Sequence, residues 1–251
     1  MIDLHTHVLP GVDDGCRTLE ESVELARAAA ADGIMALAAT PHVRFDYPTE
    51  PATMERLVGE VRAAVADAGV HIEILPGGEL ALDLLDQLTP EDVRRFGLGG
   101  NPGLVLLEFP YAGWPLGLDG TVVRLQGEGK RIVLGHPERN AEVQAEPESL
   151  ADLVDRGVLV QITAASLDGR LGGSSKRAAR ALLDRGLAHL LASDAHTPDV
   201  RAGGLRAAAE AVGDAALARW LTHDVPRALV DGERLPQRPY ARPRRRFGLR
   251  R

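Results

Sequence analysis

The opening stretch, Met1-Ile-Asp-Leu-His-Thr-His-Val-Leu-Pro-Gly-Val-Asp-Asp-Gly-Cys16, decides the fold. Its apolar start of about four residues predicts a short buried strand. His5 and His7 are two positions apart, so both imidazoles leave the same face of an extended chain, where they suit a divalent transition metal. The glycine-rich end of the stretch predicts a sharp turn that brings Asp14 close to them, whereas Asp13 is better explained as a structural residue.

Composition separates an acidic body from a basic end. The chain has 251 residues, 45% of them hydrophobic, which is enough for one large core. Residues 238–251 hold seven arginines and no acid, so residues 1–237 carry 22 basic and 36 acidic groups, a net charge of −14. Such a body disfavours broad nucleic-acid binding and suits a fold that gathers carboxylates around cations.

Cysteine usage and hydropathy bear on compartment and chemistry. Cys16 is the only cysteine, which excludes an intrachain disulfide and favours a reducing compartment. Cysteine-based phosphatases place an Arg six residues after the nucleophile, and Ser22 stands there, so we expect Cys16 to be a small packed side chain. No apolar run reaches the ~18 residues of a membrane span and no cleavable signal is visible. We expect a soluble, cytoplasmic protein.

Apolar and helical segments alternate along the chain. Thr18 and Glu21 predict a capping box at the start of the first helix, and Gly33 predicts its end. After the opening strand, further strands are expected at 34–39, 71–75, 104–107, 131–134, 158–162 and 187–192. Helices are expected after 18 and 51, within 81–95, at 119–129 and 148–156, from Ser174 or Ser175 to 184, and near 202–212, 214–221 and 224–230. This predicts one α/β domain over 1–235, closed as a (β/α) barrel of seven strands, with an open doubly wound sheet as the alternative. We expect the arginine-rich residues 236–251 to be a disordered tail.

Polar side chains recur where these strands end. The candidate ligands are His5, His7, Asp14, His42, Glu79, Glu108, His136, Asp194 and His196. Active sites of parallel β/α folds lie at the carboxyl ends of the strands, so we expect one shared rim. Nine ligands are too many for one ion and enough for two or three, with Glu79, Glu108 or Asp194 as a bridge. Structural roles remain open for single members, such as a turn for Asp14. His71, His189 and His223 lack this placement and are assigned to packing or the surface.

The order of these motifs resembles a known family. Residues 2–15, Thr40-Pro-His42, Gly78-Glu79, Leu107-Glu108-Phe109, His136-Pro-Glu-Arg139 and Ser193-Asp-Ala-His196 match in order the motifs of the PHP (polymerase and histidinol phosphatase) superfamily. The resemblance runs from residue 1 to about residue 231 and is strongest to the bacterial manganese-dependent protein-tyrosine phosphatases encoded with capsule and exopolysaccharide genes. Thr163, where the family often has Asn, and the arginine-rich tail depart from it.

The resemblance implies a distorted, TIM-like barrel with a trinuclear site. By resemblance, one metal is held by His5, His7, Glu79 and Asp194, a second by Glu79, Glu108 and His136, and a third by Asp14, His42 and His196. Manganese is the expected metal, while mixed imidazole and carboxylate sites also accept iron, zinc or cobalt.

The expected chemistry is phosphoester hydrolysis. Clustered cations lower the pKa of bound water from ~15.7 toward ~7, which makes hydroxide available for in-line attack. Arg139, and less strongly Arg44, would balance charge on the phosphoryl oxygens, although Arg139 could instead form a salt bridge with Glu138. The phenolate of tyrosine, with a pKa of ~10, leaves without full protonation, and Asp194 or His196 could share acid work.

Three functions are compatible with the sequence. The first is a phosphotyrosine-protein phosphatase whose partner is a tyrosine-phosphorylated protein such as a bacterial tyrosine autokinase of polysaccharide export. The second is a phosphoesterase for a small metabolite such as histidinol phosphate, or for nucleic-acid ends. The third is a binding module whose arginine tail grips membrane lipid or nucleic acid. Oligomeric state is not predicted.

Overall fold

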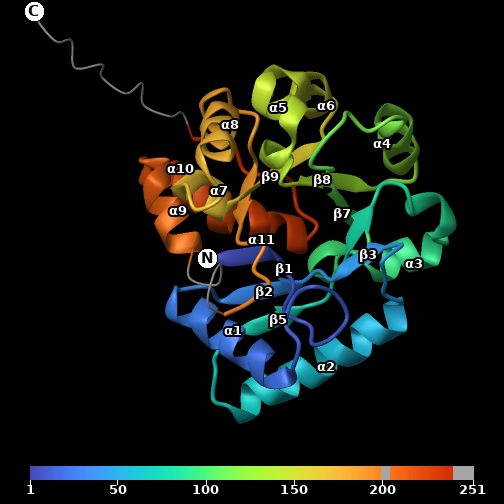
Figure 1. Cartoon of the computed structure of the whole chain (residues 1–251), viewed down its shortest axis with the longest axis vertical. Coiled ribbons are helices and arrows are strands. Elements are labelled where there is room, and N and C mark those ends of the chain that lie inside the picture. The colour runs from blue at the N-terminus through green and yellow to red at the C-terminus, as the bar shows by residue number, and fades with distance from the viewer. Residues whose placement is uncertain (199–203, 240–251) are drawn as a thin grey trace, which may run out of the picture.

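The computed structural model describes residues 1–198 and 204–239 and alternates strands with helices (Figure 1). The strands are β1 (Ile2–Thr6), β2 (Ala36–Ala39), β3 (His42–Arg44), β4 (Tyr47–Pro48), β5 (Glu73–Leu75), β6 (Glu79–Ala81), β7 (Leu104–Glu108), β8 (Arg131–Gly135), β9 (Leu159–Thr163) and β10 (Leu190–Ala192). The α-helices are α1 (Leu19–Ala31), α2 (Pro51–Asp67), α3 (Pro90–Arg95), α4 (Leu118–Gly127), α5 (Ala141–Ala145), α6 (Ala151–Asp155), α7 (Ala164–Asp168), α8 (Gly173–Asp184), α9 (Leu205–Val212), α10 (Ala215–Arg219) and α11 (Val225–Val230). Short helical turns are η1 (Leu85–Gln87), η2 (Leu98–Gly100), η3 (Pro137–Arg139), η4 (Pro147–Leu150) and η5 (Trp220–Asp224).

Two of the barrel strands are interrupted. β2 and β3 are separated by Thr40-Pro41, and β5 and β6 by residues 76–78, which are Pro-Gly-Gly. Proline cannot donate to a sheet ladder, so each strand breaks there. The two halves keep the same neighbour, because β2 pairs with β5 and β3 pairs with β6, both in parallel. Counted as continuous, they give the seven strands expected from the sequence.

The strands form a closed ring. The parallel order runs β1-β2-β5 in one sheet and β10-β9-β8-β7-β6-β3 in the other, with only β4 antiparallel at the edge. A parallel bridge between Thr6 and Ala195 joins β1 to the segment after β10, and Asp194 N–H donates to His5 C=O at 2.9 Å. The predicted distorted barrel is therefore confirmed, and the open doubly wound sheet is wrong.

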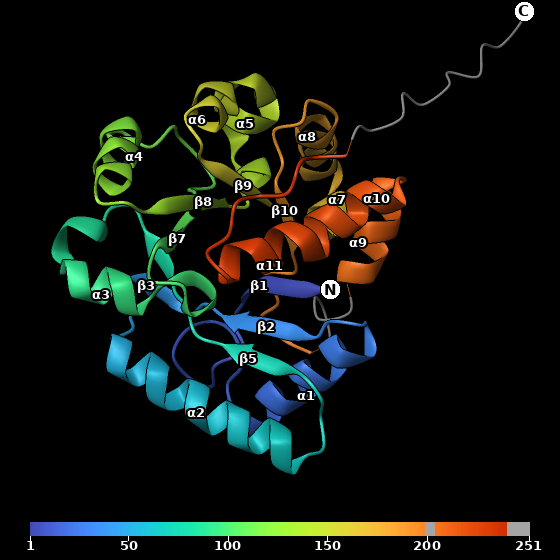
Figure 2. The same cartoon turned by 180° about the vertical axis from the view of Figure 1, so that it is seen from behind.

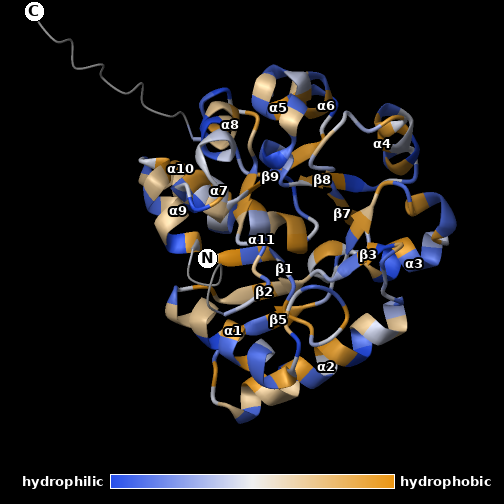
Figure 3. Cartoon of the chain, viewed as in Figure 1, coloured by the Kyte–Doolittle hydropathy of each residue, from blue (hydrophilic) through white to orange (hydrophobic). Residues whose placement is uncertain are grey.

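Aliphatic packing closes the barrel away from the site. Buried side chains of the strands form one cluster with the inner faces of the helices, and α2 shows hydrophobic and hydrophilic residues alternating along its length (Figure 3). η5 and α11 contact β1 and lie across the barrel as seen from behind (Figure 2). The Thr18 side chain accepts a hydrogen bond from Glu21 N–H, so α1 begins as predicted. The capping box is not completed, because the Glu21 carboxylate accepts from Arg17 N–H instead of Thr18 N–H. Gly33 follows with φ +87°, as its predicted role requires.

Several local expectations were wrong. The segment from His42 to Pro48 lies outside every strand expected from the sequence, but it forms the β3–β4 hairpin, whose first strand pairs with β6. α8 has no serine cap, since the chain enters it through Gly172 at φ +89°, a conformation that favours glycine. The short helices α5 and α7 were not expected.

The start of the predicted tail lies against the body. Trp220 Nε1 donates to Pro236 C=O at 2.9 Å, and the Arg238 guanidinium donates to the carbonyls of Leu183 and Ala188. The domain boundary at 235 stays a prediction, and the expectation of disorder for 240–251 lies outside the described residues. Among the helices that the structure describes, none combines the length and apolar character needed to cross a membrane.

Candidate metal centre

Nine side chains from separate strand ends meet at one rim of the barrel. They come from β1 and the loop after it (His5, His7, Asp14), from β3, β6 and β7 (His42, Glu79, Glu108), and from the segments after β8 and β10 (His136, Asp194, His196). Most are buried, whereas the Asp14 side chain is 46% exposed. The structure thus brings together every ligand candidate of the sequence, while His71, His189 and His223 belong to none of the described groups.

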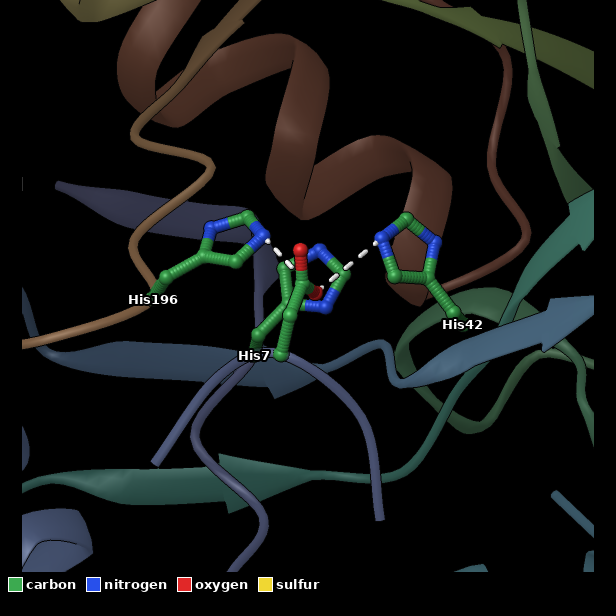
Figure 4. A group of neighbouring side chains, drawn as sticks. His7, His42 and His196 are labelled. Carbon is green, nitrogen blue, oxygen red and sulfur yellow. Dashed lines mark ion pairs between the residues drawn. The ribbon is translucent and has the colours of Figure 1, made fainter. Parts of the chain in front are cut away.

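Four overlapping groups divide this cluster, and the potential ligand atoms of each lie within 4.8 Å of one another. The groups are His5 with His7 and Asp194, His5 with Glu79 and His136, His42 with Glu79 and Glu108, and His7 with Asp14, His42 and His196. Asp14 Oδ1 lies 3.4 Å from His42 Nε2 and 3.3 Å from His196 Nε2. Figure 4 shows the imidazoles of His7, His42 and His196, three members of the last group, close together. One difference from the expected sets is that Glu108 groups with His42 rather than with His136.

Glu79 lies at the centre of the cluster. It is fully buried, and its carboxylate oxygens are 2.9 Å from His136 Nε2 and from His42 Nδ1, and 3.4 and 3.5 Å from the Nε2 atoms of His5 and His7. Burial opposes ionisation, but these imidazoles hold the pKa of the Glu79 carboxyl well below its usual range. A buried carboxylate that touches four imidazoles is placed to bridge two cations.

The polar atoms of the site fit divalent cations. Within the described part of the chain, His5 Nε2, His7 Nε2 and Glu79 Oε2 are buried and have no hydrogen-bond partner. Unpaired buried polar atoms are costly, whereas a cation accepts electron pairs from all three. Burial lowers the pKa of His7, but the carboxylates of Asp13, Asp194 and Glu79 raise this pKa well above its usual value. Cation binding at these imidazoles therefore releases protons.

Neighbouring side chains fix the ligand imidazoles. Asp13 Oδ2 accepts from His7 Nδ1 at 2.8 Å and from His42 N–H at 3.0 Å, and Gln161 Oε1 lies 3.0 Å from His5 Nδ1. The two contacts at Nδ1 leave Nε2 of His5 and of His7 facing the cluster, the usual arrangement around a metal-ligating histidine. Gly15 allows the loop to fold this closely, since a Cβ there would lie 2.2 Å from the His7 carbonyl oxygen.

Two of the candidate ligands have left-handed backbone. His136 has φ +40° and Asp194 φ +53°, and they are the only non-glycine residues with positive φ in the described ranges. Such conformations are costly and are found where function requires a side chain to point in a set direction. His136 follows β8 directly and Asp194 lies two residues after β10, and both side chains belong to the cluster.

A guanidinium lies at the mouth of the site. Arg139 donates to Asp194 Oδ2 at 2.7 Å, and its Cζ lies 4.4 Å from the centre of the Tyr111 ring. Both line a pocket of about 310 Å³ that opens onto His42, His136 and His196. Arg44 lines the same pocket, but it is paired with Glu108 at 2.9 Å and with Asp46. Glu138, the salt-bridge partner that the sequence offered for Arg139, makes other contacts. It is buried, and its carboxylate accepts hydrogen bonds from the Ser166 hydroxyl and from Thr163 N–H.

The comparisons with known proteins agree with this geometry. The family described as capsular polysaccharide synthesis, CpsB/CapC, matches residues 1–223. The chain belongs to the CpsB/CapC family. Tyrosine-protein phosphatase YwqE of Bacillus subtilis is 34% identical over 203 residues, 80% of this chain and 79% of YwqE. Tyrosine-protein phosphatase CpsB of Streptococcus agalactiae serotype III is 28% identical over 211 residues, 80% and 85% of the two chains.

A solved structure of this CpsB/CapC type has the same fold. It comes from work on YwqE of Bacillus subtilis and CpsB of Streptococcus pneumoniae, described as metal-dependent tyrosine phosphatases, and superposes with a TM-score of 0.85 at 31% identity. The match covers 96% of this chain and 100% of the other. The resemblance found in the sequence is thereby confirmed at the level of family and fold.

Three residues of this CpsB/CapC site were not assigned to it from the sequence. Asp13 was treated as structural, although it orients His7 and His42; only its position beside Asp14 could have indicated this. Gln161 and Tyr111 carried no signal, because a glutamine inside an apolar strand and a tyrosine in a loop are unremarkable before the barrel closes.

Cys16 is buried, which raises the pKa of its thiol to about 12 and leaves it packed and unreactive.

Proposed function

We propose that the chain is a metal-dependent protein-tyrosine phosphatase that hydrolyses phosphotyrosine on a protein, with a tyrosine autokinase of capsule or exopolysaccharide export as its partner. The observation that carries the proposal is the buried cluster of imidazoles and carboxylates with Arg139 and Tyr111 at its mouth. Membership of a family with named tyrosine-protein phosphatases supports it. We place the enzyme in the cytoplasm, since its one cysteine suits a reducing compartment.

We propose that two to three divalent ions, manganese first among them, are held by the nine clustered side chains. His5, His7, Glu79 and Asp194 would hold one ion, and Asp14, His42 and His196 another. A further ion would be held by Glu108 together with Glu79, whose carboxylate also contacts His136. Such ions, when bound, supply Lewis acidity that activates water and neutralises phosphoryl oxygens.

Arg139 would bind the phosphoryl oxygens. Its planar guanidinium matches two oxygens at once, and the Tyr111 ring on one face with Asp194 at its edge fixes the direction of the fork. Arg44 faces the same pocket, but its pairing with Glu108 and Asp46 assigns it to the wall of the site rather than to the reacting phosphate.

The leaving group determines how much acid catalysis is needed. Burial, with the charge of His7, lowers the pKa of His196 to about 4, so its imidazole is neutral at pH 7. Burial opposes ionisation of Asp194, but the neighbouring imidazoles of His7, His5 and His136 hold its pKa well below the usual range. In the metal-free chain, neither side chain therefore holds an acidic proton. A phenolate, with a pKa of ~10, can leave without one, which favours aryl over alkyl phosphates.

The test compares substrates on one preparation. The protein is stripped with a chelator, reloaded with Mn²⁺, and assayed on a phosphotyrosine peptide, histidinol phosphate and a nucleotide diester. We expect kcat/KM for the peptide to exceed the other two by at least ~100-fold, with activity lost again in chelator. A preference for histidinol phosphate would replace the proposal with the metabolite phosphoesterase, and turnover of none of the three would leave a binding module.

A further inference from the structure

A second, larger pocket adjoins the metal site. Its volume is about 650 Å³, against about 310 Å³ for the pocket over the cluster. One wall is formed by Phe45 of the β3–β4 hairpin and Leu82 after β6, and the other by Pro115 and Leu116 of the loop before α4. Pockets of this size and apolar character commonly bind organic ligands or side chains.

The two pockets share Arg44 as a lining residue. Its partner Glu108, at 2.9 Å, belongs to the second pocket and to a candidate metal group. The two pockets therefore adjoin at this pair. A substrate with its phosphate at the metal cluster would therefore have its adjacent atoms beside Arg44, at the entrance to the larger pocket.

The walls of the pocket expose apolar side chains to solvent. Phe45 is 60% exposed and Leu116 is fully exposed, so two large exposed hydrophobic residues line one depression. An exposed apolar patch at a pocket commonly marks a binding surface. The loop that carries one wall is held in place, because Asn140 Nδ2 donates to the carbonyls of Pro110 and Gly113.

Charge restricts the occupant further. Asp83 lines the pocket, is exposed, and has no ion pair within the part of the chain that the structure describes. Asp46 and Glu108 line it too, and both pair with the single guanidinium of Arg44. The pocket thus offers apolar walls and three carboxylates against one guanidinium, which complements an apolar group next to a cation.

We propose that this second pocket binds the polypeptide flanking the phosphotyrosine, with an apolar side chain between Phe45 and Leu116 and a lysine or arginine beside Asp83. The inference rests on the proposed function and adds a substrate preference to it. Small aryl phosphates would occupy only the pocket over the cluster, so the second pocket would separate protein substrates from small ones.

The experiment uses the full chain loaded with Mn²⁺ and two substrates, p-nitrophenyl phosphate and a phosphotyrosine peptide with leucine and lysine neighbours. Leu116→Asp should raise KM for the peptide about tenfold, the effect expected from losing burial of one apolar side chain, and leave p-nitrophenyl phosphate unchanged. Because Leu116 is fully exposed, the variant should fold. Val123→Asp on α4, 60% exposed and outside the pocket, is the matched control and should change neither substrate.

A second variant tests the charge. We expect the wild-type enzyme to prefer a peptide with lysine next to the phosphotyrosine over one with glutamate by ~3-fold, and Asp83→Lys to reverse this preference. Asp67→Lys makes the same change of net charge away from the pocket and should not reverse it. Equal effects of Leu116→Asp on both substrates, or no effect on the peptide, would overturn the inference while the phosphatase stands. Wild-type protein that turns over neither substrate would instead overturn the proposed function, and with it this inference.

Discussion

At the carboxyl ends of the barrel strands the buried side chains are imidazoles and carboxylates, whereas the opposite ends of the same strands bury aliphatic side chains such as Ile2, Leu104 and Ile132. The aliphatic end packs against helices and stabilises the fold through burial. The polar end contains unpaired atoms and left-handed backbone at His136 and Asp194, which stabilise nothing by themselves. One half of these strands therefore supplies stability, and the other half supplies the candidate cation site.

The largest effect should follow loss of the central carboxylate at the polar end. Glu79→Gln removes the negative charge that contacts four imidazoles, so we expect kcat/KM to fall by at least ~10³-fold, equivalent to ~4 kcal/mol, with fewer ions bound per chain. Steady-state kinetics and metal analysis measure this. Glu73→Gln, at an exposed position of β5, is the control. More than a tenth of wild-type activity in Glu79→Gln would contradict a bridging role.

The aliphatic end should show the reverse behaviour. Ile132→Ala leaves a cavity at a fully buried position of β8, and we expect the free energy of unfolding to fall by about 2–5 kcal/mol. Because Ile132 lies at the far end of its strand, kcat of the folded, metal-loaded variant should remain within about twofold of wild type. Chemical denaturation and kinetics on one preparation give both numbers, and Ile132→Val should lose only ~1 kcal/mol. A large loss of kcat would show that the two ends are coupled.

Orientation of the ligands should have a smaller effect. Asp13→Asn keeps the shape of the side chain but removes the charge that orients His7 and His42, so Mn²⁺ affinity should fall by about 10–100-fold, or ~1.4–2.7 kcal/mol. Calorimetric titration of metal-free protein with Mn²⁺ measures the change. Unaltered affinity would restrict Asp13 to shaping the loop, the role that the sequence indicated.

The smallest effect concerns acid stability at the aliphatic end. Burial, with Arg238 nearby, lowers the pKa of His189 to about 4, below its value in the unfolded chain. The folded state therefore resists protonation, and the stability contributed by His189 is present above pH ~6.5 and is lost as the pH falls toward 4. Between pH 7 and pH 5 this amounts to about 1–2 kcal/mol. With metal removed by chelator, the free energy of unfolding of His189→Asn should fall by about 1–2 kcal/mol less than that of wild type between pH 7 and pH 5. Equal losses in both proteins would mean that His189 is protonated in the fold.

Much of this division could be predicted from the sequence. Short apolar runs that end in His, Asp or Glu predict both the barrel and the rim at which those side chains meet, because parallel strands end together. Which of these ligands lie together within the rim could not be predicted. Glu108 lies near His42 rather than His136 because β3 continues β2 beyond the Thr40-Pro41 break and pairs with β6, a tertiary effect without a local signal. The contact of Gln161 with His5 spans 156 positions and likewise depends on closure of the ring.

Anomalous diffraction at the manganese edge, on crystals grown with Mn²⁺, tests the central claim most directly. We expect two or three anomalous peaks within the cluster, each in contact with its imidazoles and carboxylates and with Glu79 between two of them. A cluster without a peak, or manganese bound only elsewhere on the surface, would contradict it.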